Sequence, residues 1–173
     1  MAAAEKAFDA IVIGAGSVGT PTALFLARAG VRTLVLDTLP SVGQGSNKHA
    51  IGGLRATHSD PAKIRICLRS LEIISGWKEQ YGDDIEWTKG GYAFVAYREN
   101  EERTLRELLV VQKRYGLNID WLDKARMLEA IPDLNPDGLI GGTFSPDDGH
   151  ASPLLAGHAF YVQAKAAGAE FRF

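Results

Sequence analysis

A short run of apolar residues lies near the start of the chain, at residues 10–14, which read Ala-Ile-Val-Ile-Gly. A uniformly apolar and β-branched run of this length predicts a strand of a parallel sheet, buried on both faces. A segment with helical spacing follows and ends near Gly30, and a second apolar run at residues 31–37 ends in Asp37. The order strand, helix, strand predicts a βαβ unit.

The hydrophobic pattern downstream predicts further helices and strands, and hence an α/β fold. One helix is expected over residues 59–82, because Asp60 can cap it, Pro61 suits its first turn, and apolar residues recur at three- and four-residue steps. The other expected elements are two short strands within residues 85–97 around Gly90–Gly91, an amphipathic helix at 100–116, a strand and a helix at 119–134, a strand and a turn at 138–152, and a capped helix leading into a strand at 152–173.

Three glycines follow the first predicted strand in the pattern G-x-G-x-x-G, at Gly14, Gly16 and Gly19. In a dinucleotide site, the first glycine permits a tight turn, the second lets a pyrophosphate approach the backbone, and the third lets the helix pack closely on the strand. The N-terminus of the helix then offers free N–H groups to the phosphates. Asp37 stands where such folds place the acid that binds a ribose hydroxyl, which favours FAD or NAD over NADP. A βαβ unit without a ligand is the alternative.

Composition and charge exclude several classes of protein. The net charge of −2 gives no general attraction to nucleic acid, and no apolar run reaches the ~18 residues of a transmembrane segment. Cys67 is the one cysteine, which rules out an internal disulfide and fits a reducing, cytoplasmic compartment. Because Cys67 lies on the apolar stripe of the helix predicted at residues 59–82, we expect it to be a buried small residue.

The segment over residues 41–70 is a loop rich in Gly, Ser and Asn followed by the start of a helix. Between Lys48 and Arg69 it carries five Lys or Arg residues and one acid, Asp60. Such a segment can offer backbone N–H groups and cations to an anionic, planar ligand. The alternative is a surface loop followed by a solvated basic helix.

These motifs together resemble those of the FAD-dependent amine and amino-acid oxidoreductases, the group of D-amino-acid oxidase, glycine oxidase and the sarcosine oxidase β subunit. The resemblance rests on the glycine pattern, on Asp37 and on residues 45–55, and it continues through residues 87–97 and 141–173. It implies a Rossmann-like FAD-binding part at residues 1–80, a partial α+β substrate domain at 81–150, and a helix and strand at 151–173 that return toward the FAD domain. The chain corresponds to the N-terminal portion of such enzymes, so a second subunit or a C-terminal half would complete it.

The resemblance also implies roles for individual residues. Arg55 would be the cation nearest the flavin and is the catalytic candidate, because a cation there stabilises negative charge on the reduced ring. Some members of the family attach a flavin through a histidine, but Pro153 stands at the matching position and His150 and His158 do not align, so non-covalent FAD is expected. The remaining cofactor contacts are Gly14, Gly16, Ser17, Val18 and Gly19 for the pyrophosphate, Asp37 for the ribose, Gly45, Ser46, Asn47 and Lys48 along the cofactor, and Gly52, Gly53 and Leu54 near the isoalloxazine ring.

The expected activity is oxidation of a small amine or amino acid by hydride transfer to flavin. Two alternatives remain open from the residues: a non-catalytic dinucleotide-binding fragment or subunit that needs a partner chain, and an NAD-dependent dehydrogenase. The aromatics of residues 85–97 suit either a sheet face over flavin or substrate, or ordinary core. Asp147 and Asp148 are explained by turn chemistry alone, and no metal is expected, with a site formed by these acids and His150 as the alternative.

Overall fold

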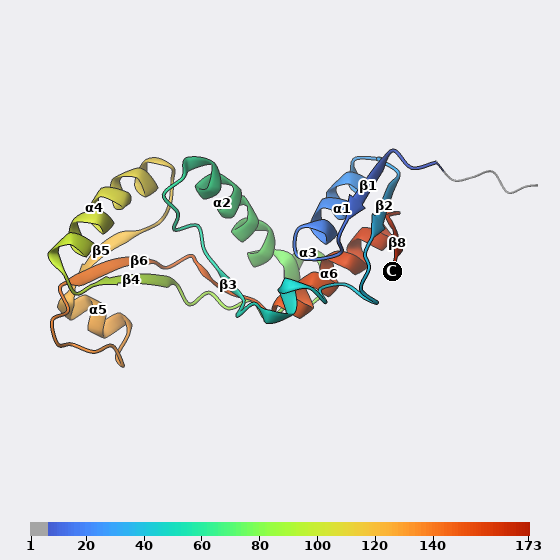
Figure 1. Ribbon diagram of the computed structural model, residues 1–173. Coiled ribbons are helices and arrows are strands. Elements are labelled where there is room, and N and C mark those ends of the chain that lie inside the picture. The colour runs from blue at the N-terminus through green and yellow to red at the C-terminus, as the bar shows by residue number, and fades with distance from the viewer. Residues whose placement is uncertain (1–6) are drawn as a thin grey trace, which may run out of the picture. The chain divides into compact units, whose positions relative to one another are not determined.

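A computed structural model describes residues 7–173 as an α/β protein with two compact units (Figure 1). The first unit consists of the described residues up to Gly52, together with Asp83–Glu86 and Ala151–Phe173. The second unit consists of Gly53–Gly82 and Trp87–His150. The second unit is therefore inserted, in sequence, within the first.

The first unit contains the predicted βαβ arrangement. Its sheet has the order β1-β2-β8, and both pairs of strands are parallel. The helix α1 connects β1 to β2, while α6 leads into β8 after a turn at Gly168, whose φ is +100°. The elements are β1 (Ala10–Ile13), α1 (Gly19–Arg28), β2 (Thr33–Leu36), the 3-10 helix η1 (Ser46–His49), α6 (Pro153–Ala166) and β8 (Glu170–Arg172).

The prediction that β1 is buried on both faces is wrong for this structure. Val12 faces α1, because its Cγ1 atom lies next to Gly19, but the side chains of Ile11 and Ile13 are 59% and 89% exposed. Successive side chains of a strand point to opposite faces. Within residues 7–173, α1 covers the face that carries Val12, and the face that carries the two isoleucines is open.

An ion pair joins the beginning of β1 to the beginning of β2. The Asp9 carboxylate accepts hydrogen bonds from Arg32 Nε at 2.9 Å, from Nη2 at 2.7 Å and from the Arg32 backbone N–H at 3.1 Å. These bonds lower the pKa of Asp9 to about 2, with the side-chain bond to Arg32 as the largest cause.

The Asp9 pair predicts a specific pH dependence of stability. Because the pKa of Asp9 is lower in the folded chain, the pair stabilises the fold above the ordinary carboxyl pKa and loses this effect as the pH falls toward 2. We expect the unfolding midpoint of the wild type to exceed that of Asp9→Asn at pH 6 and the difference to shrink between pH 4 and pH 2. Thermal melts across this range test it, and a difference that is independent of pH would contradict it.

The second unit contains two antiparallel sheets, and helices pack on the larger of them. One sheet has the order β4-β6-β5, and β3 pairs with β7 in a two-stranded ladder. The glycines of β6 allow close packing: a Cβ atom on Gly142 would lie 2.3 Å from the Phe94 carbonyl oxygen. The elements are β3 (Gly53–Leu54), α2 (Pro61–Ser75), α3 (Trp77–Tyr81), β4 (Tyr92–Ala96), α4 (Glu99–Arg114), β5 (Asp120–Asp123), α5 (Lys124–Ala130), β6 (Gly141–Ser145) and β7 (Gly149–His150).

Two expected elements of the second unit differ from the structure. The single helix predicted over residues 59–82 is divided at Gly76 into α2 and α3, because the glycine ends the first helix and begins the next. The two strands expected around Gly90–Gly91 are one strand, β4, preceded by an isolated bridge between Thr88 and His150. Gly91 has φ +77°, a conformation that interrupts a strand.

Two groups of buried side chains form the core of the second unit. One joins Leu71 of α2 to Ala56, Leu117 and Ile119, and the other joins Leu122, Met127 and Leu139. The first group places α2 in the second unit, although residues 1–80 were assigned above to the FAD-binding part. The functional assignment of residues 1–80, 81–150 and 151–173 stays a prediction. No helix within residues 7–173 is long and apolar enough to cross a membrane.

Candidate functional site

The loop between β1 and α1 has the geometry expected of a phosphate-binding turn. Gly14 has φ +100°, a conformation that glycine adopts without strain. A Cβ atom on Gly19 would lie 1.7 Å from the Gly14 carbonyl oxygen, so only glycine fits there. A Cβ atom on Gly16 would meet no atom within 4 Å. The backbone at Gly16 is therefore open to a ligand, while that at Gly19 is filled by the protein itself.

Asp37 is held against the same loop. Its Oδ2 atom accepts a hydrogen bond from the Ala15 N–H at 2.7 Å, and its Oδ1 atom accepts one from the Leu39 N–H at 2.9 Å. The Ala15 bond is the largest cause of a lowered Asp37 pKa, so the carboxylate is ionised at neutral pH. Each carboxylate oxygen can accept more than one hydrogen bond. Asp37 can therefore hold the glycine loop and still accept a bond from a hydroxyl.

The predicted cofactor contacts after β2 are divided between the two units. Gly45, Ser46, Asn47, Lys48 and Gly52 lie in the first unit with the glycine loop, whereas Gly53, Leu54 and Arg55 lie in the second. The Asn47 amide has a structural role, because its Nδ2 donates to the Pro153 carbonyl oxygen at 2.8 Å. Gly52 also packs closely, since a Cβ atom there would lie 2.2 Å from the Ala151 carbonyl oxygen. Lys48 and Ser46 are exposed.

Arg55, the catalytic candidate, lies against the sheet of the second unit. Its guanidinium carbon is 5.4 Å from the centroid of the Tyr92 ring and 5.3 Å from that of Phe94, both within the range of a cation–π contact. Its Nη1 atom donates to the Thr57 carbonyl oxygen at 2.5 Å. Within residues 7–173, no bond is made by Nε or Nη2 of Arg55. These two nitrogens form the planar fork that binds a carboxylate in bidentate fashion.

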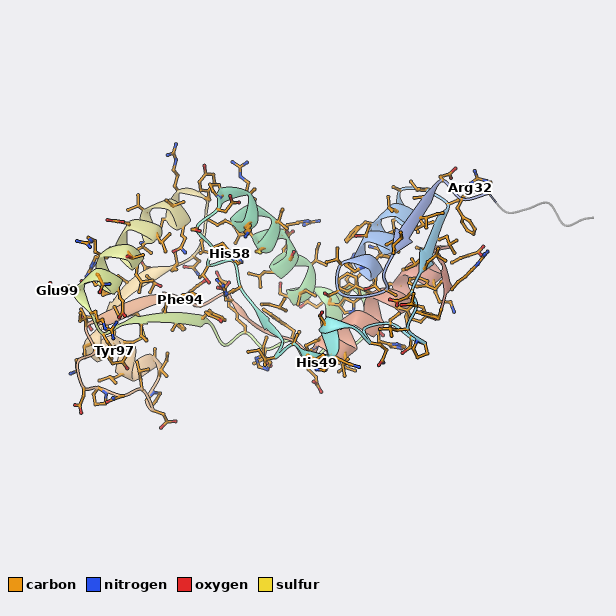
Figure 2. The ribbon with its side chains drawn as sticks, viewed as in Figure 1. Arg32, His49, His58, Phe94, Tyr97 and Glu99 are labelled. Carbon is orange, nitrogen blue, oxygen red and sulfur yellow. The ribbon has the colours of Figure 1, made fainter. Side chains whose placement is uncertain are left out.

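A small cavity of about 250 Å³ lies beside Arg55 within the second unit. Figure 2 labels two of the residues that line it, His58 before α2 and Phe94 on β4. Burial, followed by the charge of Arg55, lowers the pKa of His58, so its imidazole is neutral at pH 7. The lining residues are Arg55, Thr57, His58, Ser59, Phe94, Leu105, Leu108, Gln112 and Thr143.

The buried polar side chains around this cavity were not predicted as site residues. Gln112 is buried, and its Nε2 donates to the His58 carbonyl oxygen at 3.2 Å. Thr57 and Thr143 are also buried. The sequence pattern did not indicate a role for these residues. Gln112 lies in an amphipathic helix and Thr143 lies in a strand, and each residue type is common in such an element.

The remaining candidates are not assembled into a site. Among residues 7–173, no group of three potential metal ligands lies together. Asp147 is paired with Lys89 Nζ at 2.5 Å and with Asn118 Nδ2 at 2.7 Å, and His150 is exposed. Cys67 is half-buried against the core, and burial raises its thiol pKa. Asp148 differs from these residues because it is fully buried, and the turn sequence gave no sign of this.

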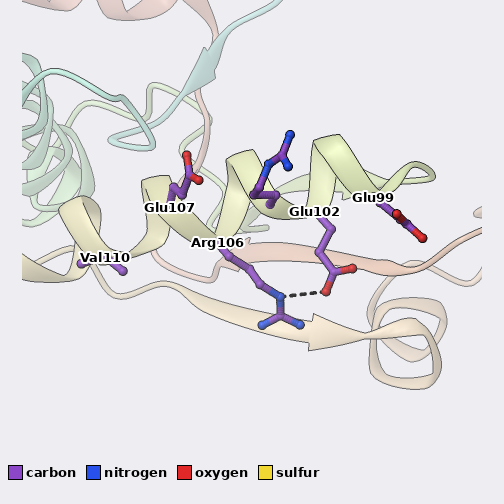
Figure 3. A pocket seen from close by; sticks show the side chains of 6 residues that line it. Glu99, Glu102, Arg106, Glu107 and Val110 are labelled. Carbon is purple, nitrogen blue, oxygen red and sulfur yellow. Dashed lines mark hydrogen bonds and ion pairs between the residues drawn. The ribbon is translucent and has the colours of Figure 1, made fainter.

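A second hollow runs along the surface of α4 (Figure 3). All its lining residues come from this one helix, and Arg106 Nε is bonded to Glu102 Oε1 at 2.8 Å. It consists of solvated i,i+4 side chains on an exposed helix face, so we assign it no role.

Comparison with known proteins identifies the family. The sequence profile described as "FAD dependent oxidoreductase" matches residues 9–173, nearly the whole chain. The chain belongs to this family. FAD is therefore the cofactor of this family. The glycine loop is compatible with it, because the backbone at Gly16 is open to a pyrophosphate and Asp37 is ionised. The match also sets aside the NAD-dependent alternative.

Individual members of the FAD-dependent oxidoreductase family align along most of the chain. Glycine oxidase of Bacillus licheniformis is 29% identical, covering 96% of this chain and 45% of the relative. An opine oxidase subunit of Rhizobium meliloti is also 29% identical, covering 95% and 47%. The crystal structure of L-proline dehydrogenase from P. horikoshii superimposes with a TM-score of 0.87 at 31% identity, covering 93% of this chain and 42% of that one. The chain thus spans less than half the length of these family members.

Proposed function

We propose that this chain provides the FAD-binding loop and part of the substrate pocket of an enzyme that oxidises a small amine or amino acid. The observation that supports this most directly is the Arg55 guanidinium, which lies over two aromatic rings beside a small cavity with its Nε and Nη2 fork unpaired in the described chain. A carboxylate is the group that this fork binds best. Glycine, sarcosine and L-proline, the compounds that name several relatives, all carry one.

The residues of the chain divide the work between holding a cofactor and holding a substrate. When bound, FAD supplies the acceptor for the hydride that leaves the substrate. Gly16 leaves room for its pyrophosphate, and Asp37 accepts a bond from its ribose. Arg55 orients the substrate carboxylate, and the neutral His58 imidazole adds no positive charge that would repel an amine. Pro153 supports non-covalent attachment, because it occupies the place of the histidine that binds flavin in some relatives.

A second proposal concerns how complete this chain is as an enzyme. The exposed side chains of Ile11 and Ile13 on β1 and the short alignment with the relatives favour a dinucleotide-binding portion that needs a partner chain or further residues for turnover. The Rhizobium meliloti relative is itself named as one subunit of an opine oxidase.

An absorbance spectrum of the purified chain separates these proposals. The chain would be incubated with FAD, desalted and measured, and then mixed anaerobically with glycine, sarcosine or L-proline. Flavin bands that survive desalting and bleach with one of these compounds support the enzyme proposal. Bands that survive but do not bleach support a binding portion that needs a partner. A colourless chain would contradict the assignment of the glycine loop as a sufficient FAD site.

The role of Arg55 predicts the effect of a conservative substitution. Arg55→Lys keeps the positive charge but loses the planar fork, so we expect carboxylate binding to weaken by about fivefold. Titration with acetate, followed by the NMR signals of the cavity residues, measures this affinity. Arg69→Lys is the matched control, because Arg69 is paired with Glu72 on the exposed surface of α2. Equal affinity of Arg55→Lys and the wild type would contradict the proposed contact.

A further inference from the structure

Asp148 is the one described carboxylate that is fully buried, and its surroundings connect it to Arg55. It lies in the turn between β6 and β7, and its Oδ1 atom accepts a hydrogen bond from the Ala56 N–H at 3.0 Å. Its Oδ2 atom is buried and makes no hydrogen bond of standard geometry among the described residues, although the Ser145 hydroxyl lies close enough to stabilise the carboxylate. A buried carboxylate with an unpaired oxygen costs folding free energy. This cost calls for an explanation that the turn itself does not provide.

The backbone on both sides of Arg55 is attached to this turn. Before Arg55, Leu54 of β3 is paired with Gly149 of β7, and after it the Ala56 N–H is bonded to the Asp148 carboxylate. Arg55 thus lies between two residues that are attached to the neighbouring residues Asp148 and Gly149. Because its backbone is fixed at both neighbours, the direction in which its side chain leaves the backbone is fixed as well.

The turn that contains Asp148 is itself held rigidly. The Asp148 carbonyl oxygen accepts a hydrogen bond from the Gly91 N–H at 2.8 Å, next to the strand that carries Tyr92 and Phe94. A Cβ atom on Gly149 would lie 2.2 Å from the Thr88 carbonyl oxygen, so the turn packs on its neighbour with no spare room. Asp148 therefore connects the backbone of Arg55 to the strand whose two rings its guanidinium covers.

We infer that Asp148 is a positioning residue that holds Arg55 over the Tyr92 and Phe94 rings, so that the guanidinium fork faces the cavity. This inference rests on the proposed role of Arg55 as the carboxylate contact. The role requires an acceptor oxygen at the position of Asp148 Oδ1. Burial raises the pKa of the carboxyl group, while the Ala56 amide, the nearby Ser145 hydroxyl and the charge of Arg55 oppose this shift.

The test compares Asp148→Ala with Asp148→Asn in the whole chain, using the Nε–Hε NMR signal of Arg55, assigned by its loss in Arg55→Lys. Alanine removes the acceptor, so we expect a more mobile Arg55 side chain, an Ala56 amide that exchanges about tenfold faster, and acetate binding about fivefold weaker. Asparagine keeps an acceptor oxygen of the same reach, so it should restore all three. Asp147→Asn is the control, because Asp147 contacts Lys89 and Asn118; it should leave the Arg55 signal unchanged.

Several outcomes would overturn the inference. One is a folded Asp148→Ala with wild-type mobility of Arg55, and another is a folded Asp148→Asn that protects the Ala56 amide but leaves Arg55 mobile. If Asp148→Ala does not fold, hydrogen exchange in the wild type still tests the inference. An Ala56 amide that exchanges without protection would show that its bond to Asp148 is absent. If acetate does not shift the Arg55 signal of the wild type, the proposed carboxylate contact is wrong. The mobility and exchange measurements would still test whether Asp148 positions Arg55.

Discussion

Gly19→Ala is expected to disrupt the chain at its glycine loop and to abolish FAD binding. The added Cβ atom would lie 1.7 Å from the Gly14 carbonyl oxygen, and this neighbour is backbone that cannot turn away like a flexible side chain. Overpacking of this kind costs about 1–3 kcal/mol or more, which corresponds to a fall of about 2–12 °C or more in the unfolding midpoint of a chain of this size. Thermal melts and titration with FAD measure the two effects.

Gly16→Ala is the matched comparison in the same loop. Its Cβ atom would meet no atom of the protein within 4 Å, so the unfolding midpoint should stay at the wild-type value. FAD binding should nevertheless weaken by more than about tenfold, because the methyl group would occupy the space through which the pyrophosphate approaches the backbone. Wild-type affinity in Gly16→Ala would show that the phosphates bind elsewhere. An unchanged midpoint in Gly19→Ala would show that the loop can rearrange.

Asp37→Ala is expected to weaken FAD binding by more than about tenfold. A hydrogen bond to a charged group contributes about 1.5–3 kcal/mol, and the substitution also releases the Ala15 amide that the carboxylate holds at 2.7 Å. Both effects act in the same direction, since one removes a cofactor contact and the other loosens the loop that carries the glycines. Calorimetric titration with FAD gives the change in affinity directly.

The control for Asp37 is Asp9→Asn. Asp9 is an acid that directly precedes β1 of the same sheet, but its hydrogen-bond partner is Arg32 and not the glycine loop. Asp9→Asn should therefore bind FAD as the wild type does at pH 7. Affinity that is unchanged in Asp37→Ala would reject the assignment of this residue to the ribose, and equal losses in the two variants would indicate a general effect of charge on the sheet.

The sequence predicted the first unit well because its signals are local. The strand, the glycine turn, the helix and Asp37 lie within residues 10–37, and each type of residue there follows from backbone geometry. Capping by Asp60 and Ser152 also placed the starts of α2 and α6 correctly, since both side chains accept a hydrogen bond from the helix backbone. The family resemblance, stated from the motifs, is confirmed by the match over residues 9–173.

The features that the sequence did not predict depend on contacts between distant residues. Whether Ile13 is buried depends on which elements cover the second face of the sheet, which the strand pattern does not reveal. Gly76 ends a helix although the apolar stripe continues across it to Trp77, which is buried. Asp147 and Asp148 are adjacent acids in one turn, but the second is fully buried and is bonded to Ala56, 92 residues away in the chain.

The insertion of the second unit into the first has a consequence for the order in which the chain can fold. β2 pairs with β8 through Leu34 and Glu170, so the sheet of the first unit cannot close until residues 170–172 have been synthesised. By then the inserted unit is available in full, and its pairing of Gly53 with His150 brings the neighbours Gly52 and Ala151 together, where the Ala151 N–H meets the Gly52 carbonyl oxygen at 3.1 Å. Closing this long loop beforehand lowers the entropy cost of the later pairing. We therefore expect substitutions that weaken the pairing of β3 with β7 to slow formation of the β1-β2-β8 sheet, although the glycine loop contains none of the substituted residues.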